Sequence, residues 1–258
     1  MHKAIIIVFG ILSCCAISAQ PIDIQPRREA TGVVMPNRSV ALAAKIMGRI
    51  KTIHHQEGEG VTAGELLISL DDAELRADLA SVQASLGEAK AELKHAGREE
   101  ARIRKLYRAK TLSQDELEDA ALVHTANRER LKMAQAAVAK AQAQFNETQI
   151  KAPFAGIITQ QDAEIGQVTQ PGTMLLVLED HSRLKLRTKV KERDIPHIEL
   201  DQTVSVTIDA LSGKTLLGAV SKIIPSGDLS THAFVVETTL PRQDKLYPGM
   251  FGKAYFNQ

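Results

Sequence analysis

The chain has 258 residues, which is enough for one or two ordinary domains. Its 32 basic and 31 acidic residues leave a formal net charge of +1, which argues against a nucleic acid held by bulk electrostatics. Aromatic residues make up 3% of the sequence and tryptophan is absent, so the side chains that usually fill a large core are scarce. We therefore expect several slim modules.

The N-terminus, MHKAIIIVFGILSCCAISAQ, has the layout of a secretory signal. Its apolar run from Ala4 to Leu12 is too short to span a bilayer stably. We prefer a signal peptide over residues 1–19, cleaved after Ala19, which would remove both cysteines. Lipoprotein anchoring at Cys14 or Cys15 is the alternative. Both interpretations predict an exported chain that is soluble or tethered.

Two stretches of the chain repeat each other. Gly48–Asp72 and Gly156–Asp180 align without a gap at an offset of 108 residues. Glycines recur at matched turn positions: Gly48 and Gly156, Gly58 and Gly166, Gly64 and Gly172. Because glycine alone takes positive φ without steric cost, we expect the same backbone corners twice. Each copy is typical of short strands joined by tight turns.

Between the copies, residues 72–149 have a strongly helical composition, with two glycines, eighteen alanines and no proline. Apolar or small residues recur there in heptad-like steps, along Leu75, Leu79, Val82, Leu86, Ala89, Leu93, Ala96, Ile103 and Tyr107, and again along Leu117, Ala120, His124, Asn127, Leu131, Ala134, Val138, Ala141 and Phe145. This pattern predicts an antiparallel coiled-coil hairpin with arms of about 36 residues, each about 55 Å long. The polar residues Glu100, His124 and Asn127 predict a weaker seam in the half nearer Ser113.

The midpoint of the insertion, RIRKLYRAKTLSQDE, interrupts the helical pattern at Thr111 and Ser113. Ser113 is a good N-cap for the second helix, and Glu116 three residues later completes a capping box. The sequence therefore predicts the turn of the hairpin at this point.

From Arg183 onward the pattern changes to alternation with turn-rich connections, which predicts five or six strands and one helical turn near Arg193 to Ile198. We expect a small antiparallel β-barrel over residues 182–258. The alternating segment from Ala30 to Ala44 is expected to give strands to both β modules.

The two repeated halves, 30–71 and 150–181, resemble the lipoyl/biotinyl-carrier fold, a flattened β-barrel of two quasi-symmetric halves. The junction at Leu70–Leu75 carries no lysine, so a swinging-arm carrier would lack its chemical centre. The predicted fold is therefore mixed α and β, elongated and modular: a split lipoyl-like barrel with an inserted helical hairpin, followed by a second small barrel.

This order of modules resembles the periplasmic adaptor subunits, or membrane fusion proteins of the HlyD-like family, of tripartite efflux pumps of the resistance-nodulation-division (RND) type. The motifs that carry the resemblance are Gly48-Arg49-Ile50, Glu57–Val61 with Gly64, Ala152–Gly156 and Tyr247–Met250. The resemblance implies a non-catalytic periplasmic protein without a cofactor, associated with the inner membrane. It implies three kinds of partner: an inner-membrane efflux transporter, a TolC-like outer-membrane channel, and further copies of the chain in a ring of six. It also implies that small molecules such as drugs are exported.

Adaptors of TolC-like channels carry at the hairpin tip an arginine, a leucine four residues on and a serine seven after that. Here these residues are Arg102, Leu106 and Ser113. The resemblance implies that they contact the channel, with Leu106 as an apolar knob and Arg102 as a charged fork. For Ser113 alone, helix capping is the stronger interpretation, whereas the triplet as a set favours recognition.

Two features depart from a simple match. Full-length adaptors of this type continue into a membrane-proximal domain, which we expect to be absent or vestigial here. A metal-efflux adaptor or periplasmic metal chaperone is the alternative function, with candidate ligands His54, His55, Met35, Met47, Asp228 and His232. Adjacent residues on a strand face opposite ways, so His54 and His55 are poorly placed to bind one ion together, and we predict no metal site.

Overall fold

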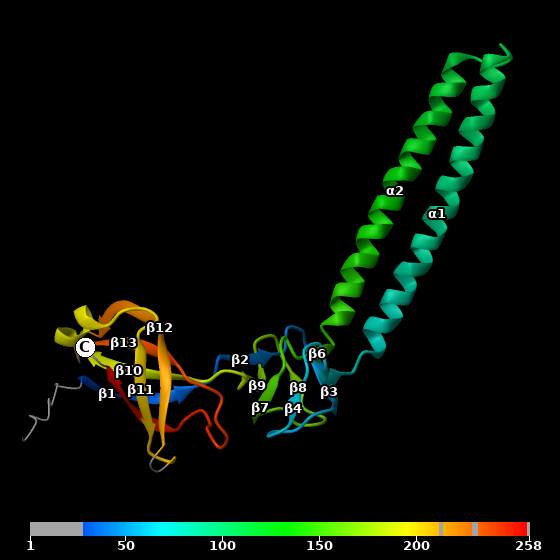
Figure 1. Cartoon of the computed structure of the whole chain (residues 1–258). Coiled ribbons are helices and arrows are strands. Elements are labelled where there is room, and N and C mark those ends of the chain that lie inside the picture. Colours follow the sequence, from blue (N-terminus) through cyan, green and yellow to red (C-terminus); the bar gives the residue numbers. More distant parts are fainter. Residues whose placement is uncertain (1–27, 212–213, 229–231, 257–258) are drawn as a thin grey trace, which may run out of the picture.

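The structure of the protein is a computed structural model, which describes residues 28–211, 214–228 and 232–256. It contains a β-sandwich, a β-barrel and a long helical hairpin, and the sandwich lies between the hairpin and the barrel (Figure 1). The predicted signal peptide and its cysteines lie outside the described residues. Neither described helix has a stretch apolar enough to cross a membrane.

The central module is a sandwich of two four-stranded sheets. One sheet has the order β2-β9-β7-β4, with β2 at Arg38–Ala43, β9 at Met174–Asp180, β7 at Gly156–Gln161 and β4 at Gly60–Val61. The other has the order β6-β5-β3-β8, with β6 at Gln149–Lys151, β5 at Leu66–Leu70, β3 at Gly48–Ile53 and β8 at Val168–Thr169.

The internal repeat is visible in the backbone of this sandwich. Strands β3, β4 and β5 of the first copy match β7, β8 and β9 of the second, and each copy gives its two-residue strand to the sheet of the other. The matched turn glycines have nearly equal positive φ, at 90° for Gly58 and 88° for Gly166, and at 83° for Gly64 and 90° for Gly172. The prediction of duplicated backbone corners is confirmed.

The sandwich core is also duplicated. Four aliphatic pairs within the repeat are at most 2% exposed: Ile50 and Ile158, Leu67 and Leu175, Ile68 and Leu176, Leu70 and Leu178. Burying each aliphatic side chain contributes about 2 kcal/mol. The exchanged strands and the shared core hold the two halves together although the hairpin separates them in sequence.

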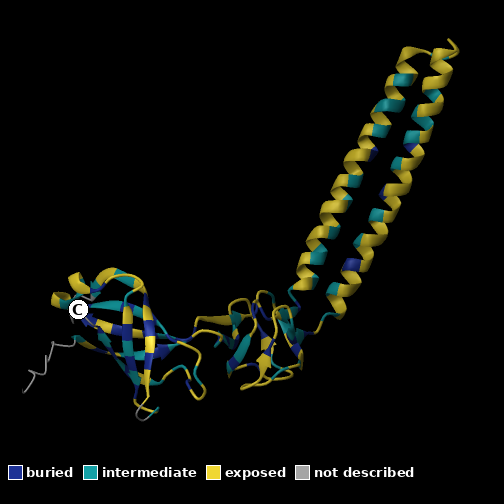
Figure 2. Ribbon diagram, in the orientation of Figure 1, coloured by how far each residue is buried: buried dark blue, intermediate teal, exposed yellow. Residues whose placement is uncertain are grey.

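The insertion forms the predicted hairpin. Helix α1 spans Ala73–Arg108 and α2 spans Gln114–Asn146, with 36 and 33 residues. At 1.5 Å per residue, each helix is about 50 Å long. The predicted stripes face each other, but most of the hairpin is exposed or half-buried (Figure 2), and of its two helices only Leu79, Ala89, Ala96 and Asn127 are buried, with 5–9% of each exposed. Two helices alone cannot cover their seam completely.

The hairpin is rooted in paired strands of the sandwich. Strand β5 leads into α1 and strand β6 follows α2, and these strands pair with Ile68 opposite Ile150. The backbone N–H of Leu70 donates to the carbonyl of Thr148 at 2.8 Å, and the N–H of Asp71 donates to the carbonyl of Arg49 at 2.8 Å. Both ends of the hairpin are therefore fixed side by side.

The remaining strands form a closed six-stranded barrel with the order β1-β10-β13-β12-β11-β14. They span Arg28–Met35 (β1), Lys185–Lys191 (β10), Ala233–Thr239 (β13), Thr215–Asp228 (β12), Thr203–Ile208 (β11) and Phe251–Phe256 (β14). The helical turn predicted near Arg193 is a 3₁₀-helix, η1, at Glu192–His197. As expected, the segment from Ala30 to Ala44 contributes to both β modules, through β1 of the barrel and β2 of the sandwich.

Two chain crossings connect the barrel and the sandwich, and Asp180 ties them together. Its carboxylate accepts hydrogen bonds from the Asn37 side chain at 2.8 Å, from Arg38 at 3.4 Å and from the backbone of Ser182 at 2.9 Å. Burial by itself would raise the pKa of this carboxyl, but the hydrogen bonds outweigh it and lower the pKa from 3.8 to about 2. Asp180 therefore stays ionised at neutral pH while it is only 4% exposed.

Candidate functional site

The tip of the hairpin is a tight turn between α1 and α2. Helix α1 ends in a Schellman motif, in which the N–H of Lys110 donates to the carbonyl of Tyr107 at 2.8 Å and that of Thr111 donates to the carbonyl of Leu106 at 3.0 Å. Lys110 has a φ of 57°, the left-handed conformation that glycine usually supplies at this position. These bonds make the turn a defined structure.

Ser113 begins the second helix as predicted. Its hydroxyl accepts a hydrogen bond from the N–H of Glu116, and the Glu116 carboxylate accepts one from the N–H of Ser113 at 2.8 Å. The backbone and side-chain hydrogen bonds from Ser113 lower the pKa of Glu116. The capping box is thus complete, and the prediction that Ser113 serves as a cap is confirmed.

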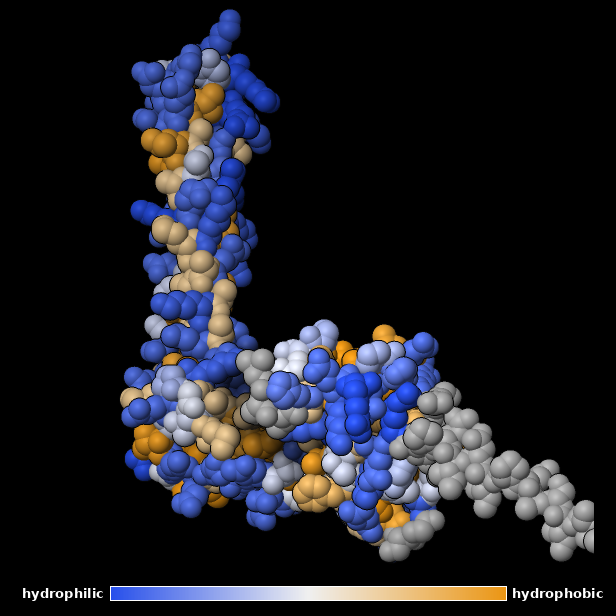
Figure 3. All heavy atoms as spheres, turned by 90° about the vertical axis from the view of Figure 1, so that its left-hand side faces the viewer, coloured by the Kyte–Doolittle hydropathy of each residue, from blue (hydrophilic) through white to orange (hydrophobic). Residues whose placement is uncertain are grey.

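Leu106 presents an apolar surface at the tip. It is 37% exposed, and its neighbour Tyr107 is 38% exposed. Tyr107 was predicted to lie in the seam, but it occupies the last turn of α1, where α2 no longer covers it. Figure 3 shows a largely hydrophilic hairpin with hydrophobic side chains near its tip. The tip therefore offers two large, partly exposed side chains.

Arg102 lies one helical turn before Leu106 on α1. Its guanidinium donates from Nε to Glu99 at 3.1 Å and from Nη2 to the other carboxylate oxygen at 2.5 Å. The hydrogen bonds from Arg102 lower the pKa of Glu99, and the same bonds raise the pKa of Arg102. The side chain is 67% exposed. The Arg102 guanidinium is therefore oriented by Glu99 of the same helix. The spacing of Arg102, Leu106 and Ser113 in the sequence did not indicate this ion pair.

The structure gathers the three predicted residues at one end of the hairpin, and no hydrogen bond or ion pair joins any two of them. Arg102 and Leu106 share the face of α1 leading to the turn, and Ser113 immediately precedes α2. Each has a local role: an ion pair, a partly exposed apolar surface and a helix cap. The tip therefore presents an exposed charge, a partly exposed apolar side chain and a capped helix start at one end of the hairpin.

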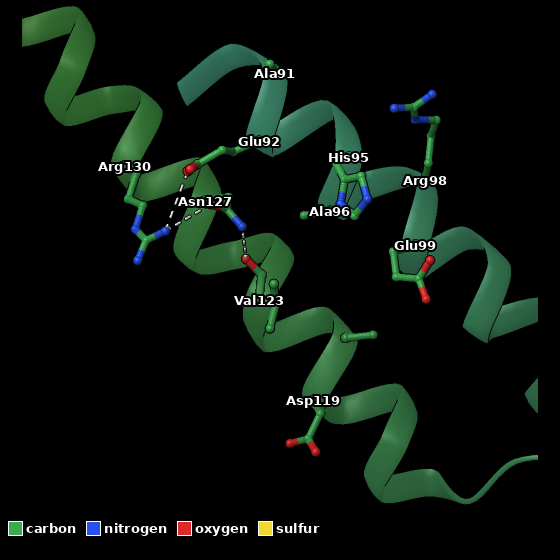
Figure 4. A pocket seen from close by; sticks show the side chains of 11 residues that line it. Ala91, Glu92, His95, Ala96, Arg98, Glu99, Asp119, Val123, Asn127 and Arg130 are labelled. Carbon is green, nitrogen blue, oxygen red and sulfur yellow. Dashed lines mark hydrogen bonds and ion pairs between the residues drawn. The ribbon is translucent and has the colours of Figure 1, made fainter. Parts of the chain in front are cut away.

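Below the tip, the seam between the helices is polar, as the pattern predicted. The Nδ1 atom of His124 lies 2.6 Å from the Glu100 carboxylate across the seam. Asn127 donates to the Val123 carbonyl at 3.0 Å, and Arg130 lies 3.5 Å from Glu92 of α1 (Figure 4). Glu92, Asn127 and Arg130 are among the residues that line a groove of about 750 Å³ on the hairpin. The sequence signalled the polar layer but not the partner of Arg130.

The candidate metal ligands do not come together. His54 contacts Ser69 at 2.9 Å, whereas His55 lies 3.1 Å from both Glu59 and Glu65, one at each ring nitrogen. Met47 is 72% exposed on the sandwich and Met35 belongs to the barrel. No cluster of three or more metal-ligating His, Cys, Asp or Glu side chains occurs among the described residues.

Comparison with protein families assigns both β modules. The family model described as a CzcB-like barrel-sandwich hybrid domain matches residues 38–180, which is more than half of the chain and includes the hairpin. A second model, described as a CusB-like beta-barrel domain, matches residues 186–258. The two matches meet close to His181 and Ser182, where the sequence predicted a boundary.

Curated relatives match over most of this chain. An uncharacterized protein of Haemophilus influenzae is 28% identical over 240 residues, covering 92% of this chain and 59% of the relative. The multidrug resistance protein MdtA of Escherichia coli is 27% identical over 236 residues, covering 86% of this chain and 56% of the relative. This chain therefore spans less than two thirds of the length of these relatives.

A solved structure shows the same fold. The membrane fusion protein Spr0693 from Streptococcus pneumoniae R6 superposes with a TM-score of 0.70 at 16% identity, covering 89% of this chain and 98% of that one. Sandwich, hairpin and barrel thus occur together in a known membrane fusion protein. With both family models matched in this order, the chain belongs to the membrane fusion protein family, the periplasmic adaptors of RND-type efflux pumps.

Proposed function

We propose that this protein is a non-catalytic periplasmic adaptor that joins an inner-membrane efflux transporter to a TolC-like outer-membrane channel. The hairpin tip contacts the channel through Arg102, Leu106 and Ser113. Copies of the chain assemble as a ring of six, because one hairpin cannot surround a channel mouth. The exported cargo is a small molecule such as a drug, in keeping with the name of the relative MdtA.

The observation that carries this proposal is the construction of the tip. A hairpin that buries few side chains of its own extends about 50 Å from the sandwich and ends in a defined turn. The turn presents an apolar side chain beside an exposed guanidinium. Arginine and tyrosine are enriched among the residues that dominate binding at protein interfaces, which favours Arg102 and Tyr107, the neighbour of Leu106, as anchors.

The contact with the channel is tested by crosslinking in intact cells. If the predicted signal is cleaved, Ser113→Cys introduces the single thiol of the mature chain. Crosslinks to the outer-membrane channel are expected from this position. Ser85→Cys, on the exposed middle of α1, serves as the matched control and is expected to give none. Crosslinks that form from barrel positions and never from the tip would show that the docking assignment is wrong.

The role of Arg102 is tested by charge reversal. Arg102→Asp is expected to abolish efflux resistance while leaving the protein level and the helix content unchanged, because the side chain is exposed. Arg98→Asp, one turn earlier on the exposed surface of α1, is the control and is expected to retain resistance. Loss of the folded protein in Arg102→Asp would mean that Arg102 has a structural role.

The two roles of Ser113 can be separated. Aspartate is as good an N-cap as serine, so Ser113→Asp preserves helix initiation and changes the surface offered to the channel. We expect unchanged thermal stability with reduced efflux resistance. Full efflux resistance in Ser113→Asp would mean that Ser113 serves only as a helix cap and makes no contact that efflux requires.

A further inference from the structure

The outer wall of the β-barrel carries a groove that is separate from the hairpin tip. It has a volume of about 430 Å³, in the range typical of small-molecule sites. Four strands contribute to it, and its lining consists of Thr31, Gly32, Val33 and Met35 of β1, Arg187 and Lys189 of β10, Val235 of β13 and Phe251 of β14.

Strand register places apolar and basic side chains next to each other in this groove. Val33 lies opposite Arg187 on one side and opposite Phe251 on the other. Lys189 lies opposite Val235. Phe251 is 66% exposed, so a large aromatic face borders the groove in open solvent. A row of four strands with a spacing of about 4.8 Å gives the groove a width of about 14 Å.

Two basic side chains of the groove are left without an ion pair among the described residues, because Glu237, which lies opposite Arg187 in the strand register, pairs with Lys185 instead. Lys185 lies 2.9 Å from Glu237, and Lys253 lies 2.7 Å from Glu29. Arg187 and Lys189 form no ion pair with any described residue. Because they are two residues apart on one strand, they project from the same face of the wall about 7 Å apart. Both can reach one anionic group.

We propose that this groove binds an amphiphilic anion, a molecule with one carboxylate or sulfonate head and a hydrocarbon body. The head lies between Arg187 and Lys189, where charge-assisted hydrogen bonds replace its hydration. The body covers Val33, Met35 and Val235 and packs against the ring of Phe251. This site is independent of the hairpin tip, and its assignment stands whether or not the tip binds a channel.

The absence of tryptophan from the sequence allows a direct test. Phe251→Trp places a single fluorophore at the rim of the groove, where an exposed ring tolerates the change. Decanoate below its micelle concentration is expected to shift the emission to the blue with a saturable dependence on concentration. Decanol and decyltrimethylammonium have similar hydrocarbon bodies without the negative charge and are expected to bind at least tenfold more weakly.

Charge removal completes the test in the Phe251→Trp background. Arg187→Gln combined with Lys189→Gln is expected to weaken decanoate binding about tenfold and to leave decanol binding unchanged. Lys90→Gln combined with Lys140→Gln, on exposed positions of the hairpin, removes the same charge elsewhere and is expected to change nothing. Both variants alter exposed side chains, and circular dichroism checks that they fold.

Three results would overturn the proposal. The first is equal affinity for decanoate, decanol and decyltrimethylammonium. The second is an unchanged affinity for decanoate when Arg187 and Lys189 are both replaced by glutamine. The third is an emission shift that appears only with vesicles of anionic phospholipid and is lost when Arg187 and Lys189 are both changed to glutamine. This result would identify the wall of the barrel as a membrane-docking surface. Crosslinking at Ser113 is not affected by any of these outcomes, so the two proposals fail separately.

Discussion

Asp180 offers the sharpest quantitative test of the structure. Asp180→Asn keeps the size of the side chain and removes the negative charge that Ser182, Asn37 and Arg38 surround. An amide can accept some of these hydrogen bonds, but it places its own NH₂ group against donors. We expect the variant to loosen the region where the barrel and the sandwich are joined.

The size of the effect follows from the pKa. A pKa of about 2 in the folded protein instead of 3.8 corresponds to about 2 kcal/mol of stabilisation by the ionised form. Because the folded-state pKa is the lower one, this contribution is fully present above about pH 4 and is lost as the pH falls towards about 2. Near pH 3 it amounts to about 1 kcal/mol.

Native-state hydrogen exchange of the β9 amides measures the free energy of opening of this region. The difference between the wild type and Asp180→Asn is expected to be about 2 kcal/mol at pH 7 and about half of that near pH 3. Asp162→Asn, on an exposed carboxylate of the same repeat, is expected to change neither value. A difference that is independent of pH, or a carboxyl group of Asp180 that titrates near 4 by NMR, would refute the reasoning.

Three further predictions concern backbone conformation. Lys110→Gly is expected to stabilise the hairpin by about 1 kcal/mol, because glycine takes the left-handed conformation of the Schellman motif without strain. Thermal melting of the helical circular dichroism signal measures the change, and a lower melting temperature than that of the wild type would contradict the role given to the turn. Gly32→Ala is expected to destabilise the barrel by about 2 kcal/mol or more, because its Cβ would lie 2.3 Å from the carbonyl oxygen of Arg187. Gly87 lies on α1, and a Cβ added there would have no atom within 4 Å, so Gly87→Ala is expected to stabilise the hairpin by about 1 kcal/mol. If Gly32→Ala and Gly87→Ala lowered the stability equally, the space around the added Cβ would not decide the outcome.

The periodic parts of the fold could be predicted from the sequence. The repeat offset placed six strands of the sandwich in matched positions, and the heptad stripes gave both helices with the capping box at Ser113. These features are local, or they repeat at a fixed interval. The exchange of β4 and β8 between the halves could not be predicted, because a two-residue strand carries no alternation and its partner is set by the tertiary fold.

The chemical details of the candidate sites were harder to predict. The triplet spacing located Arg102 at the tip but did not reveal that Glu99 holds it, since an exposed arginine can choose among several neighbours. The repeat explained why Asp72 and Asp180 occupy equivalent positions, yet their interactions differ. Asp72 forms an ion pair with Arg76 at the start of α1, whereas Asp180 accepts hydrogen bonds where the two β modules are joined. Lys110 carries no sequence signal for its left-handed conformation.

The rooting of the hairpin in paired strands has a consequence for how such adaptors can diverge. Because α1 and α2 start and end at neighbouring points of one sheet, the distance between their roots does not depend on their length. Deleting one heptad from each arm would shorten the hairpin by about 10 Å and leave every strand, turn glycine and core residue of the sandwich in place. The reach of the hairpin can thus change in steps of one heptad in each arm, while the sandwich that anchors it stays the same.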